Sequence, residues 1–322
     1  MSAQATDFDA RVAPYRGELI AYCYRMLGSA HEAEDLVQDT YLRAWRAREQ
    51  YDPMRASVRT WLYRIATNVC LTALTDRGRR PLPSGLVAPR EPLAPFAFDA
   101  EISWLQPLPE AMTVSADPAS TVVERSTVRL AFVAALQHLS ARQRGALILR
   151  DVLGFSAAES ATILGITVAA VNSSLQRARA RIRETAGGEK PLDEPSAAEQ
   201  RAWLDRYMTA FEQGDVEALK RLLTHDVVME MPPVLNWFRG TDNYGLFMDW
   251  VFEANGTDWR LEPVTANGQP GFAAYNRVGD AYRLHTLQVL TVTASGISRN
   301  SVFQDPEIFA AFGLAPSLEA PA

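Results

Sequence analysis

Eight prolines fall between residues 81 and 118 of this 322-residue chain, and they exclude a continuous helix there. The segments on either side, 8–80 and 119–186, carry apolar residues at helical spacing. A second break, GGEKPLDEPS at 187–196, precedes a segment of different pattern, 197–315. The sequence therefore predicts two all-helical domains, an acidic proline-rich linker, a second short linker and a C-terminal domain.

Charge is distributed unevenly among these segments. Residues 1–90 hold 13 arginines and 10 acidic residues, and residues 124–184 hold nine arginines and four acidic residues. The segment 91–123 carries five acidic residues and no lysine or arginine, and residues 195–322 carry 16 acidic and nine basic residues. Two basic modules in a chain of formal charge −6 indicate a polyanionic partner for the N-terminal half.

The two cysteines, Cys23 and Cys70, stand in apolar helical patterns without a CxxC partner or a nearby histidine cluster. We expect both to be packed thiols in a reducing cytoplasm, with no metal site and no cofactor. The N-terminal stretch MSAQATDFDARVAPYRG lacks the basic and apolar regions of a signal peptide, and no apolar run approaches the ~18–20 residues of a membrane span. The sequence accordingly favours a cytoplasmic protein.

Several helix ends can be placed from capping residues. Ser29 is predicted to cap a helix over AHEAEDLVQDTYLRAWR, with Glu32 completing a capping box. A further helix is predicted after Ser57, over VRTWLYRIATNVCLTALTDRGRR. In the second helical segment, Ser156 caps a short helix that ends at Gly165, and another helix follows at once. Two helices joined by a short glycine-containing turn fit a helix-turn-helix.

The helix after this turn, capped by Thr167, lies in the stretch GITVAAVNSSLQRARARIR and has two distinct faces. Its spacing predicts one buried apolar stripe, formed by Val168, Val171, Leu175, Ala178 and Ile182. Asn and Gln pair with adenine, Arg with guanine and Ser with either, and these types share the outer face at Asn172, Ser173, Gln176 and Arg177. Arg179, Arg181 and Arg183 are better placed for phosphates. A solvated helix end could carry the same arginines, but amides and arginine on one outer face favour DNA binding.

These patterns resemble a known family. LSARQRGALILRDVLGFSAAESATILGITVAAVNSSLQRARARI closely resembles region 4 of sigma-70-family factors of the extracytoplasmic-function group. EAEDLVQDTYLRAW (32–45), followed by RTWLYRIATNVCLTALTDRGRR (59–80), resembles their region 2. The resemblance implies a sigma factor rather than an enzyme, which directs core RNA polymerase to promoters and helps to open the −10 region. Its implied partners are the polymerase, at the β′ clamp and β flap, and promoter DNA.

The resemblance also implies roles for particular residues. The helix with the DLVQDTYLRAW pattern would dock on core polymerase through Asp35, Leu36, Gln38, Asp39 and Tyr41. As an ordinary amphipathic helix, it would instead use Leu36, Val37 and Leu42 as core, so we expect the two roles to be divided around it. The −10 element would be contacted by the loop DPMRAS and the next helix, at Met54, Arg55, Ser57, Trp61, Arg64, Asn68, Arg77, Arg79 and Arg80. Asn68 would recognise a base, and Trp61 would either stack on one or belong to the core. The −35 element would be read by Asn172, Ser173, Gln176, Arg177 and Arg179.

Two stretches depart from the family pattern. The loop DPMRAS replaces the more usual RGxAS, so the resemblance does not say which base it captures. Asn172 stands where many relatives have arginine, and Gln176 where others have an aromatic residue. Because amides pair with adenine, we expect the −35 preference to move toward adenine.

From residue 197 the pattern changes to two helices, a strand, a helix and a long antiparallel meander, which predicts an α+β cone. This order resembles the SnoaL-like, NTF2-type domain appended to a subgroup of these factors, as do VVMEMPPVLNWFRG (227–240) and the linker's WLQPLPE. The resemblance implies regulation in cis without a separate anti-sigma factor, and a pocket that some relatives use for isomerase or cyclase chemistry. Candidate pocket residues are Glu230, Trp237, Tyr275, Asn276, His285 and Asp305.

Several alternatives stay open at this point. The chain could be a helix-turn-helix regulator that binds DNA without polymerase, although the region 2 pattern argues against this. The C-terminal domain could be an enzyme for a small hydrophobic substrate, a sensor of a small ligand, a degenerate pocket used for intramolecular contacts, or a dimerisation module. As a tethered regulator, it could inhibit by holding the two basic modules in a polymerase-incompetent packing, or activate by contacting polymerase.

Overall fold

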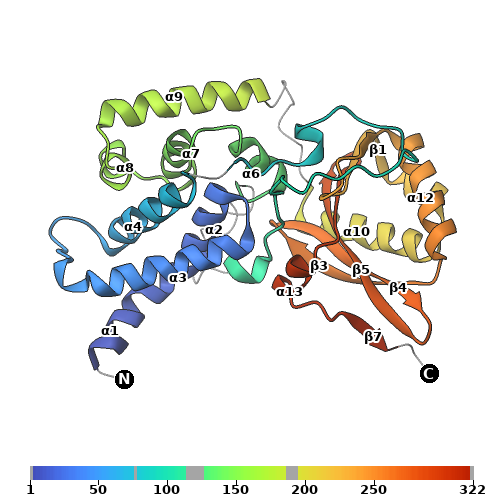
Figure 1. Cartoon of the computed structure of the whole chain (residues 1–322), viewed down its shortest axis with the longest axis horizontal. Helices are drawn as coiled ribbons and strands as arrows, with labels where there is room; N and C mark the ends of the chain where they lie inside the picture. Colours follow the sequence, from blue (N-terminus) through green and yellow to red (C-terminus); the bar gives the residue numbers. More distant parts are fainter. Residues whose placement is uncertain (1–2, 76–77, 114–126, 186–194, 320–322) are drawn as a thin grey trace. The chain divides into compact units, whose positions relative to one another are not determined.

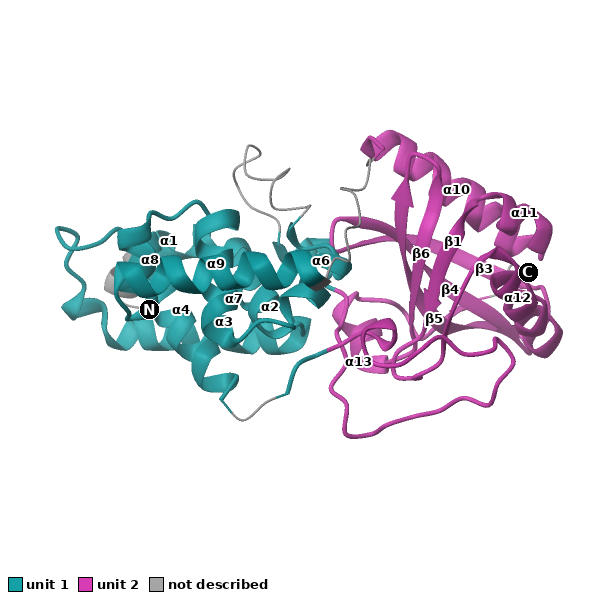
Figure 2. Ribbon diagram, turned by 90° about the horizontal axis from the view of Figure 1, so that it is seen from above, with its two compact units in different colours: residues 1–80, 108–189 teal, residues 81–107, 190–322 magenta. Residues whose placement is uncertain are grey.

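The structure is a computed structural model that describes residues 3–75, 78–113, 127–185 and 195–319 (Figure 1). The chain forms two compact units (Figure 2). One comprises residues 1–80 and 108–189, and the other comprises residues 81–107 and 190–322. Each unit is therefore assembled from two separate stretches of sequence.

The first unit is helical. Its N-terminal domain contains α1 (Ala3–Val12), a 3₁₀ turn (Ala13–Tyr15), α2 (Arg16–Leu27), α3 (Ala30–Arg46), a 3₁₀ turn (Arg48–Gln50) and α4 (Val58–Ala73). Its second domain contains a 3₁₀ turn (Glu110–Thr113), α6 (Leu130–Leu136), α7 (Ala141–Leu147), a π-helical turn (Ile148–Val152), α8 (Ala157–Leu164) and α9 (Val168–Thr185). The sequence-based prediction of two helical domains is confirmed.

Local capping explains where several helices begin. Ser29 Oγ accepts a hydrogen bond from the backbone amide of Glu32 at 3.3 Å, at the start of α3. Ser156 and Glu159 form a complete capping box at the start of α8. α4 starts as predicted, after Ser57, but ends at Ala73, several residues before the end of the predicted helix.

The cysteines lie where α2 and α4 pack together. Cys23 Sγ and Cys70 Sγ are 3.6 Å apart, and both residues are buried and unbridged, as the sequence predicted. Beside them, Tyr22 Oη lies 2.7 Å from Thr67 Oγ1. Burial raises the pKa of the Cys70 thiol well above its usual value, which keeps it protonated and unreactive.

The two helical domains pack against each other within this unit. Arg144 of α7 is buried and donates a hydrogen bond to the carbonyl oxygen of Met26, near the end of α2. Burial lowers the pKa of Arg144 to about 10, so the guanidinium remains charged at neutral pH. Phe155, just before α8, contacts the Tyr63 ring of α4 edge-on at a centroid distance of 5.0 Å, and the Arg59 guanidinium lies 4.4 Å from its ring centroid. The two domains therefore share buried contacts.

The second unit is built on a seven-stranded sheet of order β2-β1-β6-β5-β4-β3, with β7 paired to β5. Its elements are a 3₁₀ turn (Pro83–Gly85), α10 (Ala197–Glu212), α11 (Val216–Arg221), β1 (Leu223–Glu230), β2 (Trp237–Arg239), α12 (Thr241–Asn255), β3 (Trp259–Ala266), β4 (Gln269–Val278), β5 (Ala281–Thr293), β6 (Gly296–Phe303), α13 (Pro306–Ala311) and β7 (Ser317–Glu319). β1 and β6 are parallel, and the other strand pairs are antiparallel. This is the predicted α+β fold, although β2 and the parallel pairing were not predicted.

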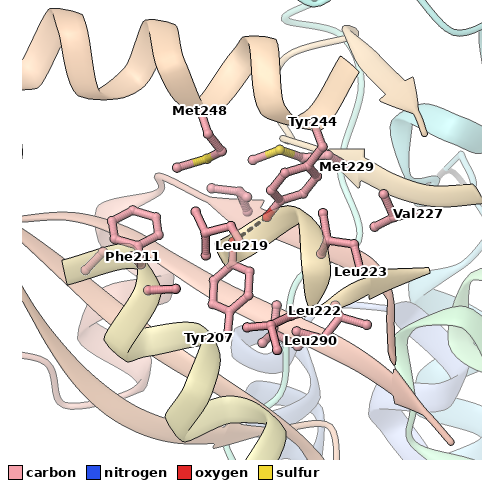
Figure 3. Close-up of a cluster of buried hydrophobic side chains, with 14 of the residues drawn as sticks. Tyr207, Phe211, Leu219, Leu222, Leu223, Val227, Met229, Tyr244, Met248 and Leu290 are labelled. Carbon is pink, nitrogen blue, oxygen red and sulfur yellow. Dashed lines mark hydrogen bonds between the residues drawn. The ribbon is translucent and has the colours of Figure 1, made fainter. Parts of the chain in front are cut away.

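The main core of this unit lies between the sheet and helices α10, α11 and α12 (Figure 3). Tyr207 and Phe211 of α10, Tyr244 of α12 and Leu290 of β5 all belong to it. The hydroxyl groups of Tyr207 and Tyr244 are hydrogen bonded, and Asn300 Nδ2 donates to Tyr244 Oη at 2.8 Å. Burial raises the pKa of Tyr244 to about 12, so this polar cluster is neutral under physiological conditions.

The strap, as we call residues 81–107, packs on this unit although it precedes the second helical domain in sequence. Trp237 anchors one part of it: its Nε1 donates to the carbonyl oxygen of Val87 at 2.8 Å, and its own carbonyl oxygen accepts from the amide of Arg90 at 2.9 Å. A β-bridge between Phe98 and Val234 adds a further attachment.

Asn236 anchors the middle of the strap. Its Oδ1 accepts a hydrogen bond from the amide of Ala97 at 2.9 Å, and its Nδ2 donates to the carbonyl oxygens of Ala94 and Pro95 at 3.3 and 3.2 Å. The amide of Leu235 donates to the Ala97 carbonyl oxygen at 2.8 Å. Because Asn236 is buried, these bonds are shielded from competing water.

The strap begins and ends at one place. The amide of Leu105 donates a hydrogen bond of 3.1 Å to the carbonyl oxygen of Pro81. Near the first end, Ser84 Oγ donates to Glu230 Oε2 at 2.7 Å. The strap is therefore a closed loop held by the C-terminal domain.

Candidate functional site

α3 carries the residues predicted to bind core polymerase. Its buried stripe consists of Ala30, Ala33, Val37, Thr40 and Ala44. The predicted contact residues lie outside this stripe and are exposed or half-buried: Asp35, Leu36, Gln38, Asp39 and Tyr41. Leu42, which the sequence assigned to the core, is 56% exposed. The helix thus presents acidic and apolar side chains together, and Leu42 belongs with this surface.

The predicted −10 face of α4 has a half-buried ring beside two exposed polar side chains. Trp61 packs on Tyr51, with ring centroids 4.9 Å apart, and so serves at least partly as core. Arg64 and Asn68 are exposed and follow Trp61 at one-turn intervals, which places all three on one side of the helix. Met54 is 92% exposed in the preceding loop. The structure therefore leaves Met54 exposed in the loop, and Arg64 and Asn68 exposed on the side of α4 that also carries the half-buried Trp61.

Two other predicted residues of this loop behave differently. Arg55 is exposed, and its amide donates to the Asp52 carbonyl oxygen at 3.1 Å. Ser57 caps α4, since its Oγ accepts from the Thr60 amide at 3.1 Å. A base contact by Ser57 would therefore compete with helix capping.

The predicted phosphate-binding arginines after α4 have partners within the unit. Arg80 Nη2 donates to Glu32 Oε1 at 2.8 Å, and Arg79 Nη1 lies 3.2 Å from His138 Nδ1. Burial, followed by the positive charge of Arg79, lowers the pKa of His138 and favours the neutral ring. Arg77 lies outside the described residues. Contact with phosphate would require Arg79 and Arg80 to leave these partners.

α9 presents the predicted −35 residues on its outer side. Asn172, Gln176 and Arg177 are exposed, and Ser173 Oγ accepts a hydrogen bond from Arg177 Nη1 at 2.6 Å. Most of the predicted stripe is buried or half-buried, at Val171, Leu175, Ala178 and Ile182. Val168 is an exception at 43% exposed, because it is the first residue of the helix and lies at the end of the stripe.

Arg179 is engaged in the described structure. Its guanidinium forms two hydrogen bonds with the Asp151 carboxylate, of 2.9 and 2.6 Å. This ion pair is exposed, so water competes for both groups and exchange with a phosphate is inexpensive. Arg179 is therefore available to DNA only by exchange, unlike Gln176 on the outer face.

Glu230 and Trp237, both predicted to line a pocket, instead hold the strap. Glu230 is fully buried; its Oε1 accepts from Arg299 Nη1 at 2.6 Å and from Ser301 Oγ at 3.2 Å. Its other oxygen accepts from Ser84 of the strap. A carboxylate with this many partners is committed to structure, so it is not a free general base. Trp237 Nε1 is likewise occupied by Val87.

Three further candidates also have structural partners. Tyr275 belongs to a separate small apolar cluster with Ala273 and Tyr282. Asn276, its neighbour on β4, donates to the carbonyl oxygen of Asn255 at 2.9 Å, since successive strand residues point to opposite faces. Asp305 caps α13. None of the three is among the residues that line the cavity containing His285, although Asn276 is hydrogen bonded to Asn255, which does line it.

His285 does line an apolar cavity of the C-terminal domain, which has a volume of about 230 Å³. Most of the wall is apolar and includes Phe96, Phe211, Met229, Met248, Trp250 and Trp259. Burial lowers the pKa of His285, which favours the neutral ring, and the ring contacts Trp259 edge-on at 5.4 Å. Among the described residues of the wall, His285 is the single titratable group, so a paired general acid and base is not assembled there.

Neither a three-ligand metal site nor a membrane-spanning helix is found among the residues that the structure describes. These residues contain no group of three histidine, cysteine or acidic residues placed to hold a metal ion. Nor does any of the described helices combine the length and apolar character needed to cross a membrane.

Comparison with known protein families agrees with this geometry. The sigma-70 region 2 family matches residues 12–80, the sigma-70 region 4 family matches residues 129–182, and the SnoaL-like domain family matches residues 204–300. The strap, which includes the cavity-lining residue Phe96, falls between the first two matches and is covered by neither. The DLVQDTYLRAW and NSSLQRAR stretches lie inside the matched ranges.

Two curated relatives match the chain over nearly its whole length. The chain is 47% identical to the extracytoplasmic-function RNA polymerase sigma factor SigG of Mycobacterium tuberculosis, over 97% of this chain and 85% of that protein. It is 28% identical to the sigma factor SigJ of the same species, over 90% of this chain and 87% of that protein. The crystal structure of M. tuberculosis SigJ superposes with a TM-score of 0.62 at 23% identity, covering 97% of this chain and all of that one, and so shares the fold.

Proposed function

The chain belongs to the extracytoplasmic-function RNA polymerase sigma factors, which direct core RNA polymerase to promoters, and we propose that its SnoaL-like domain inhibits it in cis by keeping the strap folded. The family consists of sigma factors rather than enzymes. The observation that carries the proposal is the closed strap, whose ends meet at Pro81 and Leu105. The strap is the first part of the segment, residues 81–128, that connects region 2 to region 4.

Promoter binding requires regions 2 and 4 to move apart. The −10 and −35 elements are separated by about 25 base pairs, or roughly 85 Å along B-form DNA. The first unit contains about 160 residues, and a compact body of that size has a radius of gyration of only ~15 Å. Regions 2 and 4 cannot reach both elements while they remain packed in this unit. The contacts of Arg144 and Phe155 with region 2 must therefore open.

The strap supplies the length that such an opening needs. Its 27 residues, fully extended, would span roughly 90 Å. With Leu105 bonded to Pro81, the same residues add almost nothing to the reach between the two regions. By holding the strap through Asn236, Trp237 and Glu230, the C-terminal domain favours the packed state over the extended one.

The exposed surfaces of α3, α4 and α9 support separate roles in binding polymerase, the −10 element and the −35 element, as the family pattern implies. We assign core polymerase binding to the exposed side of α3, around Asp35, Gln38 and Leu42. We assign −10 recognition to the loop and α4 face around Met54, Arg64 and Asn68, and −35 recognition to α9 around Asn172, Gln176 and Arg177. Arg79, Arg80 and Arg179 join the DNA contacts when they exchange their present partners.

Inhibition in cis also bears on partners and location. A regulator built into the chain is always at a high effective concentration, so this sigma factor needs no separate anti-sigma factor. Its partners, core polymerase and promoter DNA, are found in the cytoplasm, and we expect it to act there. The purified chain alone is expected to be a weak initiator.

The direct test is in vitro transcription with core polymerase, comparing the full chain with a truncation that ends near Glu189. More transcript from the truncated chain supports inhibition, because the strap then has no domain to hold it. Less transcript would show that the domain activates and would overturn the proposal. No transcript from either chain, on promoters selected by binding, would contradict promoter-directed initiation by this chain.

A further inference from the structure

The cavity of the C-terminal domain is shaped for a small molecule. Its volume of about 230 Å³ is below the ~300–1,000 Å³ of pockets that hold drug-sized ligands. Phe211, Met229 and Met248, which belong to the core drawn in Figure 3, form part of its wall. Its size and wall therefore suit a compact, largely apolar compound.

The polar groups of the wall define the ligand further. Among the described residues that line the cavity there is no aspartate, glutamate, lysine or arginine. Gln288 is already occupied, since its Oε1 accepts from Asn300 at 2.7 Å and its Nε2 donates to Thr286 at 3.2 Å. The side chains of His285 and Gln304 have no hydrogen-bond partner among the residues that the structure describes. The cavity thus offers hydrogen-bonding groups that are neutral, with His285 half-buried in the wall and the exposed Gln304 beside solvent, and a charged ligand would lose its hydration without compensation.

One wall of the cavity comes from the strap. Phe96 lines the cavity and contacts Trp250 of α12 edge-on, with ring centroids 5.8 Å apart. Phe247 of α12 lies beside both rings. Phe96 and Trp250 are 41% and 40% exposed, so this aromatic group stands between the cavity and solvent. When the strap leaves the domain, Phe96 leaves the cavity with it.

We propose that this cavity binds a small, neutral, largely apolar molecule that hydrogen bonds to His285, and that its contact with Phe96 stabilises the docked strap. A ligand shifts an equilibrium only by its differential affinity for the two states, and Phe96 supplies that difference here. The binding step stands independently of the proposed function. The consequence for transcription rests on the proposed function: an occupied cavity favours the inhibited state, and loss of the ligand favours release of the strap.

Binding is tested on the full-length protein with matched probes. Benzamide, indole and p-cresol are small neutral molecules with one hydrogen-bonding group, and benzoate is an anion nearly isosteric with benzamide. We expect at least one neutral probe to bind with a Kd of about 1 mM or tighter, and benzoate to bind at least about tenfold more weakly than benzamide. Calorimetric titration measures both values. No binding by any neutral probe, or equal binding of benzamide and benzoate, overturns the proposal.

Variants locate the binding. Val251→Phe inserts a ring at a cavity-lining position and should weaken probe binding by about tenfold or more. Val278→Phe makes the same change at an exposed position at the end of β4, away from the cavity, and should leave binding unchanged. His285→Phe keeps the ring but removes the hydrogen bond, and should weaken p-cresol binding. Unchanged affinity in both Val251→Phe and His285→Phe overturns the assignment of the site.

The link to the strap has its own readout. Hydrogen exchange of the Ala97 and Leu235 amides, which join strap and domain, should slow when the probe is bound. Phe96→Ala should weaken binding and abolish this slowing, whereas Leu93→Ala, at an exposed strap position outside the cavity wall, should do neither. Unchanged exchange on binding overturns the coupling. Because no polymerase is present, failure here is distinct from failure of inhibition in the transcription assay.

Discussion

The backbone amide of Leu105 is hydrogen bonded to the carbonyl oxygen of Pro81 at 3.1 Å. This single bond joins the two ends of the strap, which is the first part of the connection between regions 2 and 4. A linker would ordinarily separate the two modules that it connects, but this one returns to its starting point and lies on a third domain. The length of the strap is therefore taken up on the C-terminal domain.

Releasing the strap should activate the protein. Asn236→Ala removes three hydrogen bonds to the strap and leaves the amide of the half-buried Ala97 without its acceptor. Each such hydrogen bond contributes about 0.5–1.5 kcal/mol, so their loss shifts the strap toward release. We expect more transcript per polymerase than from the unchanged protein. Asn243→Ala, which removes an exposed local hydrogen bond, is the matched control and should have no effect. Equal transcript from the two variants would argue against the strap as the inhibitory element.

Weakening the contact between regions 2 and 4 should have a similar effect by another route. Phe155→Ala removes the ring that contacts Tyr63 and Arg59 of α4. Loss of a buried phenylalanine costs about 3–5 kcal/mol in a full core, and here part of that cost falls on the interface. The radius of gyration from small-angle X-ray scattering should increase.

Phe8→Ala is the control for Phe155→Ala, because Phe8 contacts Trp45 within region 2 itself. It should lower thermal stability without expanding the molecule. If both variants keep the compact dimensions of the unchanged protein, Phe155 does not hold the two regions together.

Residues of α9 should separate into base-reading and phosphate-binding groups. Gln176→Ala should lose about 1–3 kcal/mol of binding to −35 elements that carry adenine, and little on others. Arg183→Ala should weaken binding to all sequences and reduce the slope of log affinity against log salt by about one. Fluorescence anisotropy with a set of −35 variants measures both. A sequence-independent loss with Gln176→Ala would remove this residue from base reading.

His285 should make the C-terminal domain sensitive to acid. Burial lowers its pKa below the usual value of 6.5, so the unfolded chain takes up a proton before the native domain does as the pH falls. The stability associated with the neutral ring is present above pH ~6.5 and is lost as the pH falls toward the lowered pKa. His285→Gln should flatten this dependence below pH ~6.5 in thermal unfolding. An unchanged slope would show that the ring is not effectively buried.

His138 provides a comparison in the other unit. Its pKa is also lowered, by burial and then by the charges of Arg79 and Arg181. His138→Gln should therefore affect the acid sensitivity of the helical unit and leave that of the C-terminal domain unchanged. The two variants together separate the contributions of the two units.

The helix starts, the family and the fold class could be predicted from the sequence alone. The starts of α3, α4 and α8 were predicted from Ser29, Ser57 and Ser156, because a cap involves residues only three apart. Most of the buried stripe of α9 follows from its 3.6-residue period, and the long stretches of regions 2 and 4 identified the family. The order of helices and strands after residue 197 was sufficient for the α+β fold.

Only the tertiary structure decided where the strap lies and what the C-terminal residues do. The strap is held by bonds between residues far apart in sequence, such as Asn236 with Ala97, and its prolines carry no periodic pattern that would reveal a partner. The sequence predicts Glu230 as a pocket residue, but in the structure its carboxylate accepts hydrogen bonds from Arg299 and Ser84. Phe96 has no apparent role until it appears in a cavity wall. A local pattern records what a segment can form, whereas long-range contacts depend on which surfaces the fold brings together.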